Sequence, residues 1–189
     1  MYLKQLIASN KTIFSLEDLG KIWCIENKDY LKLVASRLFA RGEIFRISRG
    51  LYSISEKINK YELANKLKTP SYVSLETVLQ KDGVIFQDYN NTVFSVSNNS
   101  FSRKIGSDTF CYLKLDDKLL MNPLGIADLG QARIATVERA LCDRVYFSAD
   151  YYFDNLRGIN LEKLSVISKI YNLRVQKEIA ALISEVKNK

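Results

Sequence analysis

Apolar residues recur at helical spacing in three short stretches at the start of the chain. The second stretch follows Ser15 and the third follows Asn27, and both of these side chains favour the N-cap of a helix. Gly42 follows the third stretch and can end it in the left-handed conformation that glycine adopts without strain. Residues 44–54 contain two β-type runs separated by Ser48-Arg49-Gly50, which is typical of a β-hairpin with a three-residue loop. The pattern predicts three helices followed by a hairpin.

The predicted third helix has one apolar side and one basic side. Its apolar residues stand at positions i, i+3, i+4 and i+7 and are expected to face the core: Leu31, Val34, Ala35 and Leu38. The opposite, solvated side and its edges carry Lys28, Lys32, Ser36, Arg37 and Arg41. The hairpin adds Arg46 and Arg49. Basic residues are therefore expected on both the third helix and the hairpin.

Three short helices followed by a basic hairpin are the elements of a winged helix-turn-helix. In that arrangement the third helix can enter the major groove of DNA, while the hairpin lies along phosphates or in the adjacent minor groove. Lys32 and Ser36 are then the candidates for contacts with base edges, and Lys28 and Arg41, at the helix ends, are placed for phosphates. The full set of candidate DNA-binding residues is Lys28, Lys32, Ser36, Arg37, Arg41, Arg46 and Arg49.

The same order of elements also occurs in protein-interaction modules, in which exposed helices carry Lys and Arg for solubility alone. Arg46 can in addition pair with Tyr52 across the hairpin and have only a structural role. Tyr52 itself is expected to pack between the hairpin and the core. Basic residues on both the third helix and the hairpin tip favour the DNA-binding interpretation over this alternative.

Beyond residue 70 the pattern becomes a mixture of helical and β-type segments. A helix is predicted over residues 71–83, capped by Ser71 or Ser74 and ended by Gly83. Arg133-Ile134-Ala135 has the pattern of a strand end. Three β-type runs divided by polar and glycine-containing turns predict a small antiparallel sheet: 92–96, 101–105 and 109–115. Three further helices are expected after the caps Thr136, Asn160 and Asn172.

We expect an α+β protein, with an N-terminal winged helix-turn-helix and a mixed α/β C-terminal domain that holds the small antiparallel sheet and the C-terminal helices. The expected boundaries are 1–55 for the winged helix, 56–69 for a connecting helix without Gly or Pro, and 70–189 for the C-terminal domain.

The formal net charge is +7, from 28 Lys and Arg against 21 Asp and Glu. Residues 1–60 hold 11 basic and 6 acidic residues, so most of the positive excess lies in the first third. This charge favours an anionic partner, such as nucleic acid or an acidic protein surface.

The composition excludes several classes of function. The chain has no histidine, which removes the commonest general base, the Ser-His and Cys-His pairs of hydrolases and zinc sites built on imidazole. Cys24, Cys111 and Cys142 are far apart and match no metal or redox motif, so we expect no metal and no cofactor, and thiols of this kind fit a reducing cytosol. No window approaches a membrane span, and the first residues are charged too early for a signal sequence. We therefore expect a cytoplasmic protein with no membrane partner.

Three segments carry a resemblance to a known family. They are residues 41–52 (RGEIFRISRGLY), residues 72–79 (YVSLETVL) followed by Gly83, and residues 134–143 (IATVERALCD). In the order and spacing of these segments the chain resembles the AbiEi-like antitoxins of bacterial type IV toxin–antitoxin and abortive-infection systems. The resemblance covers most of the chain.

This resemblance implies a transcriptional repressor that is also an antitoxin. In that family the winged helix binds inverted repeats upstream of its own operon and represses it, while the C-terminal domain opposes a toxin that resembles nucleotidyltransferases. The toxin is antagonised without a stable complex, so the implied binding partner is double-stranded operator DNA. Arg41, Arg46 and Arg49 fall on the family's basic wing region. The C-domain candidates are Arg139, Asp143 and Arg144, although a charged first turn and an i, i+4 Arg–Asp pair also explain them structurally.

Two other functions stay open. A stand-alone winged-helix regulator with a ligand- or protein-binding C-terminal domain would share the N-terminal features. A nucleotidyltransferase-like enzyme would use Gly106-Ser107 with Asp116 and Asp117, whose carboxylates would hold a metal for phosphoryl transfer. Adjacent carboxylates on a strand point to opposite faces, and a Gly-Ser-Asp sequence suits a turn between strands. We therefore expect a protein that is not an enzyme.

Overall fold

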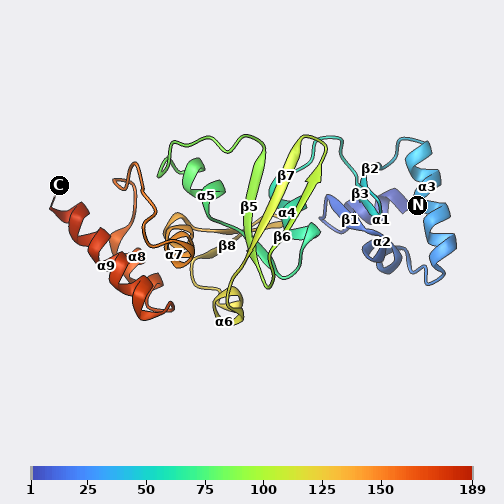
Figure 1. Cartoon of the computed structure of the whole chain (residues 1–189). Helices are drawn as coiled ribbons and strands as arrows, with labels where there is room; N and C mark the ends of the chain where they lie inside the picture. Colours follow the sequence, from blue (N-terminus) through green and yellow to red (C-terminus); the bar gives the residue numbers. More distant parts are fainter. Residues whose placement is uncertain (1, 189) are drawn as a thin grey trace. The chain divides into compact units, whose positions relative to one another are not determined.

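The computed structural model describes residues 2–188, and these divide into two compact units. The first unit ends at Leu67 and the second begins at Lys68. Figure 1 shows the first unit in blue to teal and the second in green to red. The described residues form one three-stranded and one six-stranded sheet together with helices, so the α+β class is confirmed.

The first unit combines helices with a small antiparallel sheet. Its elements are α1 (Tyr2–Ala8), β1 (Ile13–Ser15), α2 (Leu16–Trp23), α3 (Lys28–Ala40), β2 (Phe45–Ser48), β3 (Leu51–Ser53) and α4 (Lys60–Leu67). Strand β3 lies between β1 and β2 and is antiparallel to both, with Tyr52 opposite Phe14 on one side and opposite Arg46 on the other. The sequence did not predict β1, because three residues between two helices are too few to show an alternating pattern.

Helices α2 and α3 begin at the side-chain caps predicted from the sequence. The hydroxyl of Ser15 accepts from the backbone N–H of Asp18 at 3.1 Å, and the Asp18 carboxylate accepts from the backbone N–H of Ser15 at 2.7 Å, which completes a capping box at α2. The Asn27 side chain caps α3 by accepting from Asp29 and Tyr30. Gly42 follows α3 with a φ of 70°, as expected for a left-handed stop.

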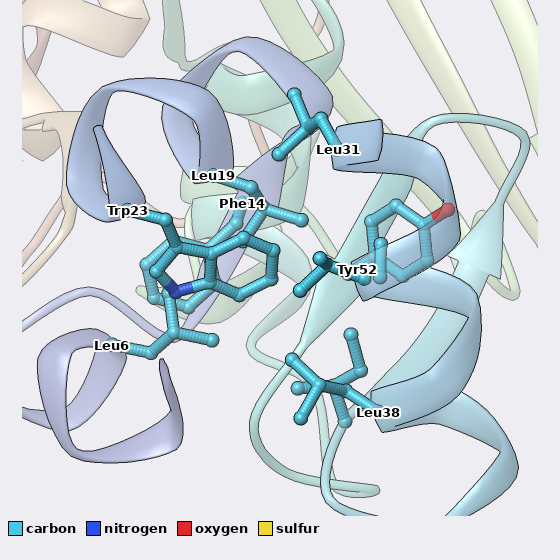
Figure 2. Packing of buried hydrophobic residues seen from close by; sticks show 10 residues of the cluster. Leu6, Phe14, Leu19, Trp23, Leu31, Leu38 and Tyr52 are labelled. Atoms are coloured by element: carbon cyan, nitrogen blue, oxygen red, sulfur yellow. The ribbon is translucent and has the colours of Figure 1, made fainter. Parts of the chain in front are cut away.

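The core of the first unit collects apolar side chains from α1, α2, α3 and the sheet (Figure 2). Its members include Leu6, Phe14, Leu19, Trp23, Leu31, Leu38 and Tyr52. The apolar side of α3 that the sequence predicted is therefore the side that packs. Tyr52 also packs in this core, as expected, and it ties the hairpin to the helices.

Helix α4 is joined to the first unit through a buried carboxylate. Glu62 is only 6% exposed, and its carboxylate accepts from the backbone N–H groups of Thr12 at 3.1 Å and Ile13 at 3.0 Å and from the Thr12 hydroxyl. Lys66, one turn later, forms an ion pair with Asp18 of α2. The segment 56–69, which we expected to connect two domains, thus contains a helix that clusters with the first unit.

The second unit is built on a six-stranded mixed sheet with the strand order β6-β7-β5-β4-β9-β8. Its strands are β4 (Ser71–Val73), β5 (Thr92–Ser97), β6 (Phe101–Ile105), β7 (Asp108–Lys114), β8 (Ile126–Leu129) and β9 (Ala132–Ala135). Its helices are α5 (Glu76–Lys81), α6 (Asp117–Met121), α7 (Val137–Phe147), α8 (Leu161–Ser168) and α9 (Leu173–Lys187). Helix α7 packs against α5, α8 and α9.

Two expectations for the second unit were wrong. Residues 71–73 form the buried strand β4, and the helix predicted over 71–83 begins only at Glu76, after Leu75, which has a φ of 57° and gives no side-chain cap. The sheet is larger than expected and is not antiparallel throughout, because β5 pairs in parallel with β7, and β4 in parallel with β9. A strand buried on both faces has no alternation to reveal it, and pairing between distant strands leaves no local signal.

The predicted starts of the last three helices are confirmed. Thr136, Asn160 and Asn172 each accept a hydrogen bond from a backbone N–H in the first turn of α7, α8 and α9. The β6–β7 hairpin and its turn at Gly106, with a φ of 59°, are also as expected. None of the helices within residues 2–188 combines the length and the apolar composition that a bilayer crossing requires.

Replacing Glu62 by Ala should lower the free energy of unfolding of the first unit by roughly 2–4 kcal/mol, because the buried N–H of Ile13 and the half-buried N–H and hydroxyl of Thr12 lose their acceptor. Urea unfolding followed by the fluorescence of Trp23, the one tryptophan of the chain, measures the change, since this side chain is 5% exposed in the first core. Glu17→Ala removes an exposed carboxylate of α2 and serves as control, with an expected change below about 0.5 kcal/mol. Equal midpoints for the Glu62 and Glu17 variants would contradict this role of Glu62.

Candidate nucleic-acid interface

Helix α3 turns its basic residues to solvent. Lys28, Lys32, Ser36, Arg37 and, at the C-cap, Arg41 are all exposed. Leu31, Val34, Ala35 and Leu38 on the other side are at most 5% exposed. The structure thus places every α3 residue that we expected to meet DNA on the accessible side of the helix.

The β2–β3 hairpin brings two further cations to the surface. Arg46 on β2 and Arg49 in the turn are exposed, and Gly50 completes the turn with a φ of 76°. The register shifts between Arg46 and Ser48, so the hairpin bulges just before its tip. Arg46 lies opposite Tyr52 in the register, but no contact between its guanidinium and the Tyr52 ring is found within residues 2–188.

The cations of this surface differ in their partners. Among residues 2–188, no carboxylate forms an ion pair with Lys28, Arg37, Arg46 or Arg49. Lys32 instead contacts Asp29 at 3.0 Å, and Arg41 lies 3.8 Å from Glu43. Exposed pairs of this kind contribute about 0–1 kcal/mol, so both cations can exchange their partner for a phosphate. We call the seven exposed residues, Lys28, Lys32, Ser36, Arg37, Arg41, Arg46 and Arg49, the basic surface.

Charge alone does not describe the exposed side of α3. Leu33 is 45% exposed, and Tyr30 and Phe39 are each 48% exposed. None of these three residues was among those predicted from the sequence to meet DNA. The signal was present, because Leu33 falls opposite the core positions of the helix at the spacing of 3.6 residues per turn.

The two C-domain candidates Arg139 and Asp143 lie at the centre of the second unit, with no exposed surface. Their side chains approach to 3.4 Å between Nε and Oδ1, which is the i, i+4 pair expected on α7. Arg139 also donates to the Tyr72 hydroxyl at 2.9 Å and to the carbonyls of Leu119 at 2.7 Å and Leu124 at 2.9 Å. Its guanidinium therefore links α7 to β4, α6 and the segment before β8.

Asp143 is surrounded by hydroxyl donors. Its carboxylate accepts from Tyr72 at 3.0 Å, from Ser74 at 2.7 Å and from Tyr171 at 2.6 Å. Burial raises the pKa of the Tyr72 and Tyr171 hydroxyls well above their ordinary value, and the nearby carboxylate raises it further, so both phenols stay protonated donors. Burial also raises the pKa of Asp143, and Arg139 together with the hydroxyls opposes that shift. We call Tyr72, Ser74, Arg139, Asp143 and Tyr171 the buried network.

Arg144, the third C-domain candidate, belongs to a neighbouring cluster. Its guanidinium lies 3.4 Å from the carboxylate of Glu76 on α5 and 4.5 Å from the ring centre of Tyr151. The hydroxyl of Tyr151 lies 3.2 Å from that of Tyr89. These partners join α5 and α7 to the loops that follow each of them. The sequence could not show them as a group, because Glu76 and Tyr151 are 75 positions apart.

An open groove of about 360 Å³ runs along the C-terminal part of the second unit. One wall is the loop of residues 151–157, and the other is formed by Leu182, Glu185 and Val186 of α9. Tyr152 in this loop is 78% exposed. The groove lies within the size range of sites for small molecules.

The residues of a nucleotidyltransferase-like metal site are not brought together. Asp116 caps α6 by accepting from the backbone N–H of Lys118 at 2.9 Å, so the two adjacent carboxylates stand at the start of a helix. Within residues 2–188 no three carboxylate or cysteine side chains are close enough to hold a metal ion. Gly106-Ser107 forms the turn of the β6–β7 hairpin.

Replacing Asp143 by Asn should lower the free energy of unfolding of the second unit by about 3–5 kcal/mol, because Arg139 is left as a buried charge without its counter-ion. Unfolding followed by circular dichroism measures the loss, and hydrogen exchange resolved by mass spectrometry should locate it in the peptides of α7 and β4. Asp150→Asn, an exposed carboxylate of the same unit, is the control and should change stability by less than about 0.5 kcal/mol. Wild-type stability of the Asp143 variant would show that the buried network has no structural role.

No protein-family model matches this sequence, and no curated protein matches it. A function is therefore inferred from the side chains of the chain itself, above all from the exposed cations of α3 and the hairpin.

Proposed function

We propose that the first unit is a winged helix-turn-helix that binds duplex DNA, and that the protein is a transcriptional repressor. The observation that carries this proposal is the basic surface. Four of its cations have no carboxylate partner among residues 2–188, although the chain holds 21 acidic residues. Unpaired cations gathered on one helix and one hairpin are suited to neutralise phosphates and to release their counter-ions.

The elements that carry these cations fit the grooves of DNA. A major groove is about 12 Å wide and admits one α-helix, and α3 presents its exposed side over thirteen residues. Its ends hold Lys28 and Arg41, where contacts with flanking phosphates position a helix without reading sequence. The hairpin carries Arg49 at its tip, and such a wing can reach the adjacent minor groove or the backbone.

The resemblance to AbiEi-like antitoxins supports a more specific role. We propose that the protein represses its own operon at inverted repeats and antagonises a nucleotidyltransferase-like toxin through its second unit, without a stable complex. Arg139 and Asp143 then act in the second unit by holding its fold, since neither side chain has exposed surface. The residues that oppose the toxin are to be sought among exposed side chains of that unit.

A second candidate function is a stand-alone regulator whose second unit binds a ligand or a protein. The groove between residues 151–157 and α9 favours it, because a pocket of about 360 Å³ is large enough for a small effector. Both candidates share the DNA-binding first unit. They differ in whether a toxin is encoded next to the gene.

The protein should bind duplex DNA from the region upstream of its own gene, with an affinity that falls steeply as salt is added. Fluorescence anisotropy titrations at several salt concentrations test this. The double variant Arg46→Ala and Arg49→Ala should weaken binding to different sequences alike and reduce the slope of log K against log salt by about 2, one for each phosphate contact.

The matched control removes two exposed cations from the second unit, through Lys169→Ala and Lys177→Ala. It has the same net charge as the hairpin variant and should leave both affinity and slope near wild type. Variants of Lys32 and Ser36 should instead change the preferred site. Binding that does not depend on salt, or equal losses in the two charge-matched variants, would refute the assignment of DNA binding to the basic surface.

Co-expression with the neighbouring open reading frame should rescue growth if that frame encodes a toxin. The readout is colony formation with the two genes under separate inducible promoters, and a form of the protein that carries Arg46→Ala and Arg49→Ala separates rescue by the second unit from repression of the operon. A neighbouring gene that is harmless on its own would contradict the antitoxin role and favour the stand-alone regulator.

A further inference from the structure

The exposed side of α3 has an apolar side chain at its centre. Successive residues of an α-helix are turned by about 100°, so Leu33 points away from the core positions Leu31, Val34 and Leu38. It is 45% exposed, while the core residues of the helix are at most 5% exposed. The next turn of the exposed side carries Ser36 and Arg37, at i+3 and i+4 from Leu33.

The charges around Leu33 indicate what covers it. Lys28, Lys32, Arg37 and Arg41 are all exposed on the same helix, and Arg46 and Arg49 are exposed on the hairpin of the same unit. A surface with this charge attracts a polyanion and repels a second copy of itself. Of the polyanions that such a helix can meet, duplex DNA also offers an apolar group in the groove. That group is the C5 methyl of thymine, since the other major-groove edges are hydrogen-bond donors and acceptors.

We propose that Leu33 contacts thymine methyl groups in the major groove and thereby selects DNA sites with thymine beneath the centre of α3. The inference rests on the proposed function, because it requires α3 to enter the groove. Lys32 and Ser36 flank Leu33 on one side and Arg37 on the other, so polar contacts with neighbouring base pairs would fix the position of the methyl against the leucine. Leu33 then supplies the discrimination between thymine and a base that lacks the methyl.

Uracil tests this directly, because it pairs as thymine does and lacks only the methyl group. The probe is the duplex from the region upstream of the gene, prepared once with thymine and once with uracil throughout. Burying one methyl contributes roughly 0.8 kcal/mol, so wild-type protein should bind the uracil duplex about 4-fold more weakly for each methyl that Leu33 contacts. Leu33→Ala should bind the thymine duplex more weakly than wild type and should bind both duplexes equally.

Arg49→Ala is the matched control. It removes a hairpin cation that meets the backbone, so it should weaken binding to both duplexes and keep the wild-type ratio between them. Circular dichroism and the midpoint of urea unfolding, followed by the fluorescence of Trp23, confirm that each variant is folded. Leu33→Gln repeats the test with a residue of high helix propensity.

The outcomes separate the two proposals. A thymine-to-uracil ratio near one in wild-type protein that binds DNA overturns the role of Leu33 and leaves DNA binding in place. A ratio that persists in both Leu33 variants also overturns it, because the methyl groups are then read elsewhere. Failure of wild-type protein to bind either duplex at low salt overturns the DNA-binding function and the role of Leu33 with it. Loss of the ratio in the Leu33 variants alone supports the proposal.

Discussion

The second unit depends on one buried charge. Arg139 has no exposed surface, and the removal of a guanidinium from water costs several kcal/mol unless its N–H groups find acceptors. Those acceptors come from separate elements: the carboxylate of Asp143 on the same helix, the hydroxyl of Tyr72 on β4, and carbonyls of Leu119 in α6 and Leu124 before β8. Each of these elements must keep its position for the Arg139 guanidinium to keep all of its acceptors. The network therefore ties β4, α6, α7 and the segment before β8 to one another through a single side chain.

The glycine next to this charge shows how tightly it is enclosed. A Cβ atom at Gly125 would lie 2.8 Å from the Cβ of Arg139 and 2.8 Å from Cδ1 of Ile167, and the residue has a φ of 78°. Both the space and the backbone conformation thus require glycine at this point. Tyr171 also lies against this charge, with its ring centre 5.3 Å from the guanidinium and its hydroxyl donating to Asp143.

Local signals in the sequence predicted much of this fold and long-range ones did not. The capping side chains Ser15, Asn27 and Thr136 correctly predicted where their helices begin, since a cap depends on residues within one turn. Strand β4 was mistaken for the start of a helix, because all three of its residues are buried and show no alternation. The Arg139–Asp143 pair was predicted from its i, i+4 spacing. Its burial was not, because Tyr72 and Tyr171 reach it from 67 and 28 residues away.

The sequence predicted that the basic residues of α3 and the hairpin are exposed, but it did not lead us to expect the exposed Leu33 between them. Basic residues are recognised from their type alone, whereas the exposure of Leu33 follows only from its position on α3 opposite Leu31, Val34 and Leu38. Charged and apolar residues also differ in the distance over which they act. Cations such as Arg37 act over a Debye length of about 8 Å at physiological ionic strength, so they tolerate displacement and set affinity for any sequence. An apolar contact requires atoms within about 4.5 Å, so in the proposed complex Leu33 would respond only to the base pair directly beneath it. In the DNA complex that we propose, the cations at the ends and edges of α3 would therefore meet the backbone first, and Leu33 would contact the groove floor afterwards.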